Sequence, residues 1–237
     1  MSSHKKLNKN YRFIKNNSNR IVVFCGPSGV GKTLVIDYLS KRYRFKKISS
    51  ITTKDLNKKE KKDGSIQVTP LKFKILETES DLFMSVRNYG NAYAYSTKNI
   101  VELLKNKNTI IIMESPCSYI INDVSILMPK SIIFGFLPPN KNFIKSNLKK
   151  RDSEDYIKQK IRIKTGEVEK DYLYYASKFV KIYKILQKKN DPTYAINQVE
   201  KILLEKGLIG INNIYEKRAS IELTALKYAA ANCQAEK

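Results

Sequence analysis

The sequence predicts an α/β fold in which a parallel sheet is flanked by helices. Short runs of β-branched and aromatic residues alternate along the chain with segments whose apolar residues recur at helical spacing. A glycine-rich turn, "GPSGVGK", joins the first such run to the first helical segment. The chain has 237 residues, 42% of them hydrophobic, which is enough for one sizeable core.

Each expected element has its own local signal. "RIVVFC" (20–25) is typical of a buried parallel strand, and Val35 and Leu39 lie on one face of the helix that follows. Either Ser96 or Thr97 is the predicted N-cap of one helix, and Asn140 is the predicted N-cap of another. Residues 66–95 show no clear pattern. Further strands are predicted at 45–52, 109–113, 131–137 and near 178–186, and helical segments at 96–107, from 140 onward, over much of 148–190, and after Asp191.

Composition predicts one domain with two appendages. The first 18 residues are polar and basic and are expected to be a disordered tail, residues 19–206 the folded domain, and residues 207–237 a helical extension. Lys and Arg number 45 against 22 Asp and Glu, a formal charge of +23 that favours anionic partners. A general bias toward Lys, Asn and Ile would give the same charge without any binding site.

The sparse cysteines and the single histidine exclude several classes of protein. Cys25, Cys117 and Cys233 are far apart and odd in number, so neither a disulfide framework nor a CxxC metal site is expected, and the predicted location is the cytoplasm. His4 lies in the polar N-terminal segment, which argues against histidine catalysis. No apolar run approaches the length that spans a bilayer, so no membrane partner is expected.

The glycine-rich turn carries the clearest chemical signal. Gly26, Gly31, Lys32 and Thr33 fit G-x-x-x-x-G-K-[ST], with a predicted strand before it and a predicted helix after it. Backbone N–H groups in such a turn converge on phosphate oxygens, the lysine neutralises phosphate charge, and the threonine hydroxyl ligates Mg²⁺. A nucleoside triphosphate site is therefore predicted, formed by Gly26, Ser28, Gly29, Val30, Gly31, Lys32 and Thr33, with Thr33 as the metal ligand.

The order of several short segments resembles the guanylate kinases, P-loop enzymes that phosphorylate GMP from ATP. "GPSGVGK" matches their phosphate loop, "SSITTKD" (49–55) their S-x-[ST]-T-R segment, and "YGNAYAYS" (89–96) their G-N-Y-Y-G-[ST] stretch. "SIIFGFLPPN" and "KKRDSEDYIKQKIRI" resemble the strand and the basic lid that follow, and "NDPTYAINQVEKIL" the final helix. The resemblance covers residues 19–206 and implies a P-loop kinase fold with a small mixed acceptor-binding insert at about 52–95 and a helical lid at about 148–170.

The resemblance also implies roles for individual residues. Lys32, Arg151 and Arg162 are the expected catalytic cations, and Lys149 and Lys160 are further cations of the lid. The expected acceptor-binding residues are Ser50, Lys54, Tyr93 and Glu114. ATP and Mg²⁺ are the implied cofactors, and the lid is expected to exclude water during transfer.

The sequence departs from the family pattern on the acceptor side. Met84 stands where the family has the glutamate that binds guanine, and Gln67 where it has a phosphate-binding tyrosine. Lys54 replaces an arginine, and the second arginine position falls near residues 57–58. Glu114 is a single acid where the family has two, so it either orients the Mg²⁺ water shell or contacts the base. Either the register near 70–88 is shifted or the base specificity differs.

Four functional hypotheses follow. The first is a guanylate kinase that converts ATP and GMP (or dGMP) to ADP and GDP. The second is a kinase of another nucleoside monophosphate or of a sugar phosphate, which Met84 favours. The third is a non-catalytic binding module, although the intact phosphate loop argues against it. Nucleic-acid binding rests on charge alone, because no recognition motif accompanies it. The oligomeric state stays open, a homodimer included.

Overall fold

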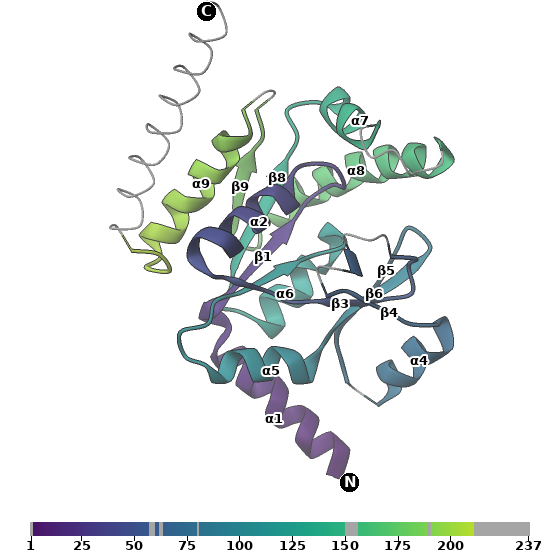
Figure 1. The fold of residues 1–237 in the computed structure, drawn as a ribbon, viewed down its shortest axis with the longest axis vertical. Helices are drawn as coiled ribbons and strands as arrows, with labels where there is room; N and C mark the ends of the chain where they lie inside the picture. The colour runs from purple at the N-terminus through teal and green to yellow at the C-terminus, as the bar shows by residue number, and fades with distance from the viewer. Residues whose placement is uncertain are drawn as a thin grey trace, which may run out of the picture. The chain divides into compact units, whose positions relative to one another are not determined.

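A computed structural model describes most of the chain. The described residues are 2–56, 60–61, 64–79, 81–149, 156–188 and 191–210 (Figure 1). Residues 1–196 form one compact unit, which holds every element discussed below except the end of the last helix, α9 (Pro192–Glu205). The second unit begins at residue 197.

A five-stranded parallel sheet forms the centre of the first unit, in the order β2-β7-β1-β8-β9. Its strands are β1 (Ile21–Cys25), β2 (Lys46–Lys47), β7 (Ile111–Glu114), β8 (Ile132–Leu137) and β9 (Ile182–Leu186). Every residue of β1 and β8 is buried, as expected for parallel strands covered on both faces. The predicted parallel α/β fold is confirmed.

Helices cover this sheet, and alternate side chains of β1 face two different apolar layers. Ile21 and Val23 belong to the main core cluster, together with residues of several helices. The ring of Phe24 lies 5.3 Å from that of Phe134, which belongs to neighbouring β8. The helices of this unit are α1 (Ser2–Asn16), α2 (Lys32–Tyr43), α4 (Pro70–Thr78), α5 (Thr97–Lys105), α6 (Ile121–Leu127), α7 (Lys141–Lys149) and α8 (Tyr156–Ala176).

The predicted caps are present where the sequence places them. The Ser96 side chain accepts a hydrogen bond from the Asn99 N–H at the start of α5. The Asn140 side chain accepts one from the Phe143 N–H at the start of α7. Each cap satisfies a backbone donor that the first helical turn leaves unpaired.

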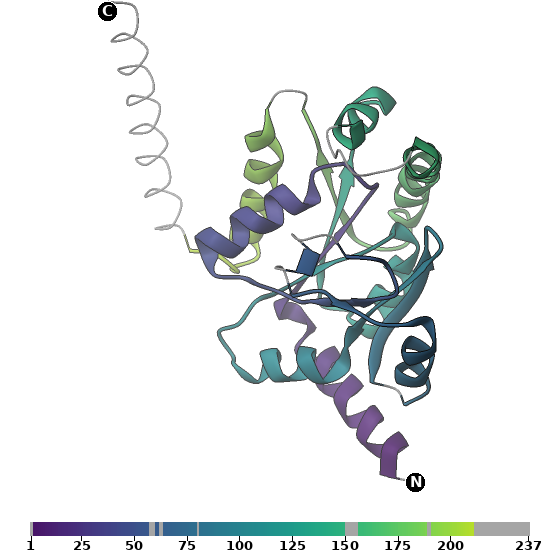
Figure 2. The same ribbon diagram turned by 45° about the vertical axis from the view of Figure 1, so that its right-hand side comes forward.

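A second, four-stranded sheet follows the order β4-β3-β6-β5 and is mixed, because β3 pairs parallel with β4 and antiparallel with β6. Its strands are β3 (Ser50–Thr52), β4 (Ile66–Gln67), β5 (Leu82–Asn88) and β6 (Asn91–Ser96). Phe73 of α4 is buried in a small cluster with Leu82 and Ala94 of this sheet. Figure 2 shows α4 against this sheet, apart from the helices of the parallel sheet.

Two local predictions were wrong. Residues 45–52 were expected to be one strand, but β2 joins the parallel sheet and β3 joins the mixed sheet. Residues 2–16, expected to be disordered, form α1. Ile14 is fully buried, and the Tyr11 hydroxyl donates to the Leu82 carbonyl at 3.3 Å. Tertiary contacts of this kind stabilise a helix that composition alone does not.

None of the described helices combines the length and apolar character needed to cross a membrane.

Candidate active site

The phosphate loop is held between β1 and α2 by backbone geometry. Gly26 has φ +138°, and a Cβ atom there would lie 2.6 Å from the Phe136 carbonyl oxygen of β8. Gly31, the N-cap of α2, has φ +98°. These conformations disfavour any residue with a side chain and leave the loop's N–H groups at a helix N-terminus, where anions bind well.

Lys32 lies over its own loop. Its side chain is 9% exposed, and its ammonium group donates to the carbonyl oxygens of Gly26 at 2.7 Å and Pro27 at 3.2 Å. These bonds neutralise no anion, so a phosphate group gives the ammonium a stronger partner than it has here. The Lys32 ammonium is therefore already positioned at the loop, where a phosphate could replace the two carbonyl oxygens as its partner.

Two helices hold the loop from outside. The Asn147 amide of α7 donates to the Gly29 carbonyl at 2.9 Å, and the Arg162 guanidinium of α8 donates to the Ser28 hydroxyl at 2.8 Å. Arg162 is thus placed at the loop, next to the site of the expected phosphates. Arg151, the other predicted lid arginine, lies outside the described residues.

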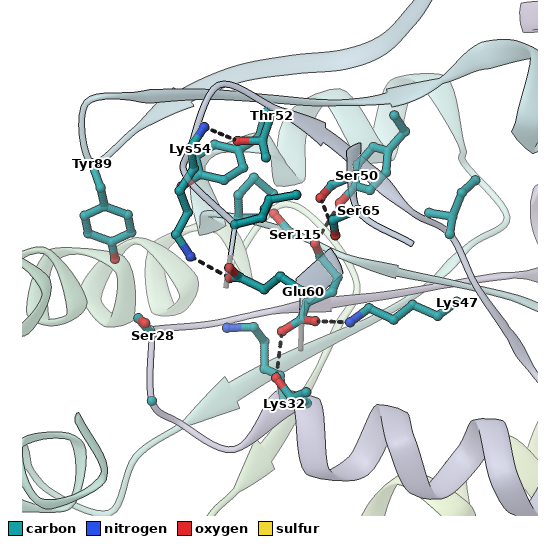
Figure 3. A pocket seen from close by; sticks show the side chains of 18 of the residues that line it. Ser28, Lys32, Lys47, Ser50, Thr52, Lys54, Glu60, Ser65, Tyr89 and Ser115 are labelled. Carbon is teal, nitrogen blue, oxygen red and sulfur yellow. Dashed lines mark hydrogen bonds and ion pairs between the residues drawn. The ribbon is translucent and has the colours of Figure 1, made fainter. Parts of the chain in front are cut away.

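One cavity of about 430 Å³ joins the loop to the mixed sheet (Figure 3). That volume is in the usual range for a small-molecule site. Of the predicted loop residues, Ser28, Gly29, Gly31, Lys32 and Thr33 line it, while Val30 is buried and Gly26 is not part of the lining. The four predicted acceptor residues, Ser50, Lys54, Tyr93 and Glu114, line it as well.

Glu114 connects the two sides of the cavity. Its carboxylate accepts from the Thr33 hydroxyl at 3.2 Å and pairs with the Lys47 ammonium at 3.1 Å. Burial raises the pKa of Glu114, but the charges of Lys47 and Lys32, together with the hydrogen bonds from Lys47 and Thr33, hold the pKa below its ordinary value. Glu114 is therefore an anion next to the threonine of the loop.

Two of the predicted acceptor residues are paired with other residues of the cavity lining. Lys54 forms an ion pair with Glu60 at 2.5 Å, and the Ser50 hydroxyl donates to that of Ser65 at 3.2 Å. Figure 3 shows the Lys54 side chain reaching toward Glu60 across the cavity. An acceptor phosphate would have to draw Lys54 away from this carboxylate.

Known proteins resemble this chain along most of its length. The guanylate kinase of Malacoplasma penetrans is 31% identical over 199 residues, which cover 82% of this chain and 97% of the relative. The chain belongs to the guanylate kinase family. The guanylate kinase of Mycoplasma genitalium is 28% identical over 196 residues, covering 81% of this chain and 78% of the relative. This membership makes the chain a kinase and confirms the prediction of an enzyme rather than a binding module.

Two further comparisons agree on the fold. The crystal structure of guanylate kinase from Anaplasma phagocytophilum has a TM-score of 0.55 at 19% identity, covering 78% of this chain and 85% of that one. A family model described as the Rad17 P-loop domain matches residues 5–133. That stretch contains β1, the phosphate loop and β7 but ends before α7 and α8, so it reports the P-loop domain common to these proteins.

The structure explains the departure at Met84 from the family pattern. A bulge interrupts the β5–β6 pairing between Phe83 and Val86, and Met84 within it has φ +58°. Its side chain is 8% exposed and belongs to the main core cluster. Gln67, the other departure, bonds to Asp55 on the outside. Neither residue lines the cavity, so neither contacts a ligand that the cavity holds.

Several further candidate site residues were not predicted from the sequence. Lys47 and Glu60 lie in lysine-rich stretches that look like ordinary surface, and only the cavity distinguishes them. Tyr89 and Glu169 come from segments 80 residues apart that meet beside the loop. In the described part of the chain no cluster of three or more His, Cys, Asp or Glu side chains has the arrangement of a metal site.

Proposed function

We propose that this kinase transfers the γ-phosphate of ATP to GMP or dGMP and produces ADP and GDP. The observation that carries the proposal is the shared cavity, which is lined both by the phosphate loop and by Ser50, Lys54 and Tyr93. Phosphoryl transfer needs two anionic substrates in line and cations around them. Lys32, Lys54 and Arg162 supply positive charge from three elements.

The roles of the loop residues follow from their contacts. Lys32 exchanges its bonds to the loop carbonyls for the β- and γ-phosphates, and Arg162, next to Ser28, neutralises charge that develops during transfer. Lys54 leaves Glu60 for the acceptor phosphate, with Tyr93 as a hydroxyl partner. A lysine binds phosphate as a point charge without the paired bonds that an arginine makes.

The donors beside the loop suit Mg²⁺. The Thr33 hydroxyl and the Glu114 carboxylate are hard oxygen donors in direct contact, the ligand chemistry that this ion prefers. Thr33 would hold the ion, and Glu114 would orient its water shell. When bound, Mg²⁺ adds charge neutralisation at the phosphates.

A specific observation also favours a different acceptor. Within the described lining of the cavity the carboxylates are Glu60 and Glu114, and each is paired with a lysine. In the family pattern a glutamate accepts from the guanine base, and a base donor left unpaired in a buried site is costly. Another nucleoside monophosphate or a sugar phosphate would make no such demand.

The deciding experiment measures ADP formation from ATP and Mg²⁺ with GMP, dGMP, AMP, CMP, UMP and ribose phosphates. Lys32→Ala serves as the blank, and the exposed Lys41→Ala on the same helix as the matched control. Selectivity for GMP of tenfold or more supports the proposal. Preference for another acceptor supports the alternative, and equal rates with and without acceptor would refute both.

A further inference from the structure

Tyr89 occupies a backbone position that disfavours tyrosine. It forms, with Gly90, the two-residue turn between β5 and β6, and both residues have positive φ, +52° and +75°. Two-residue hairpin turns of this kind favour Asn, Asp or Gly, because the left-handed conformation is strained for larger side chains. A strained residue that persists is held by contacts elsewhere, and such positions cluster at functional sites.

The contacts of the Tyr89 hydroxyl lead to a buried acid. The hydroxyl donates to Glu169 Oε1 at 3.1 Å, and the Ser118 hydroxyl donates to Glu169 Oε2 at 3.2 Å. Glu169 is 1% exposed and lies on α8, the helix that also carries Arg162. A buried carboxylate needs such donors, so the pair links the hairpin of the mixed sheet firmly to α8.

The Tyr89 ring contacts a functional cation. The Arg162 guanidinium carbon lies 5.3 Å from the centre of the ring, within the range of a cation–π contact. The same guanidinium donates to the Ser28 hydroxyl of the phosphate loop at 2.8 Å. Tyr89, Arg162 and Ser28 all line the cavity, and Figure 3 shows the Tyr89 and Ser28 side chains on the same side of it.

We infer that Tyr89 is a positioning residue for phosphoryl transfer: Glu169 anchors its hydroxyl, and its ring holds Arg162 against the phosphate loop. The inference rests on the proposed transfer to an acceptor at this cavity. Because Tyr89 sits on the acceptor hairpin and Arg162 touches the donor loop, their contact sets the distance between the two substrates. Glu169 acts through Tyr89 and touches no substrate.

The first test compares variants that remove the ring or only its hydroxyl. Tyr89→Asn suits the turn and removes the ring, so its kcat should be lower by about tenfold. Tyr89→Phe keeps the ring, so its kcat should fall less. Tyr174→Leu is the matched control. Tyr174 lies on α8 as Arg162 does, its ring contacts the Lys184 ammonium at 4.7 Å, and it does not line the cavity. Its kcat should equal that of the wild type.

The second test separates positioning from general stability. In an Arg162→Ala background, Tyr89→Asn should change kcat by less than twofold, since the group that it positions is gone. Glu169→Gln keeps an oxygen that accepts from Tyr89 and should retain most of the activity, whereas Glu169→Leu should behave like Tyr89→Asn. Independent, multiplicative losses in the double variant, or an unchanged kcat in Tyr89→Asn, would overturn the inference.

A measurement without substrate keeps this inference separate from the proposed activity. The Nε–H resonance of Arg162, assigned by its loss in Arg162→Lys, should shift and lose protection from exchange in Tyr89→Asn but not in Tyr174→Leu. If no acceptor were phosphorylated, the proposed function would fail while this resonance still reported the contact. An unchanged resonance in Tyr89→Asn would refute the positioning role whatever the activity.

Discussion

The phosphate loop and the mixed acceptor sheet differ in what holds their functional groups. The loop presents mainly backbone N–H groups, and β8, α7 and α8 contact it at Gly26, Gly29 and Ser28. The mixed-sheet side presents side chains from β3, from β6 and from the segment after β3, and its Lys54 is paired with Glu60. In the proposed reaction, the donor site is therefore built before its ligand arrives, whereas the acceptor site would have to exchange the ion pair of Lys54 for its ligand.

The largest expected effect lies on the donor side. Lys32→Ala removes the ammonium that faces the transferred phosphates, and kcat should fall by about 10²- to 10³-fold, the usual cost of one such group. Steady-state rates of ADP formation measure it, with Lys41→Ala on the surface of α2 as the control. Equal rates in Lys32→Ala and the wild type would show that the loop is not where transfer occurs.

Gly26→Ala tests whether backbone packing builds the loop. The new Cβ would lie 2.6 Å from the Phe136 carbonyl, so we expect a loss of about 3 kcal/mol of unfolding free energy and a Tm lower by roughly 6–12 °C. Gly90→Ala is the matched variant, because φ is also positive there but no atom lies within 4 Å. Its loss should be about 1 kcal/mol, and similar losses in both would contradict the packing argument.

Lys54 tests the exchange of ion pairs on the acceptor side. Lys54→Ala should raise the KM for the acceptor about tenfold and leave the KM for ATP within twofold, since a charged hydrogen bond contributes about 1.5 kcal/mol or more. Lys54→Arg restores the planar fork that suits phosphate and should match or improve on the wild type. An equal rise in both KM values after Lys54→Ala would place Lys54 outside the acceptor site.

The smallest expected effect is the pH dependence that Glu169 gives to stability. Burial raises the pKa of Glu169 above its ordinary value, and the Lys32 charge and the bonds from Tyr89 and Ser118 oppose this only in part. The folded protein therefore holds the proton more tightly than the unfolded chain, so stability falls as pH rises from the unfolded pKa through the folded one.

Glu169→Gln should remove that decline. The Tm of the variant relative to that of the wild type should rise by a few degrees at most between pH 4 and pH 7. The change is small because only one hydrogen-bonded group is involved. Glu167→Gln, at a surface position of the same helix with its carboxylate 48% exposed, controls for the change of charge. A constant difference between Glu169→Gln and the wild type at every pH would argue against the raised pKa.

The sequence by itself determined the parallel α/β fold, the phosphate loop and the caps of α5 and α7. These features depend on local order, because strand runs, a glycine spacing and a capping side chain act within a few residues. The family motifs also predicted Ser50, Lys54, Tyr93 and Glu114 as acceptor-binding residues. Their roles in catalysis stay predictions.

Only the tertiary structure decided the rest. Met84, within the bulge of β5, packs in the main core cluster, and a shift of one residue on a strand reverses its face without any local signal. Helix α1 and the contact of Tyr89 with Glu169 depend on residues about 70 to 80 positions apart along the chain. Contacts over that distance arise when the whole core packs, and no pattern within a short segment specifies them.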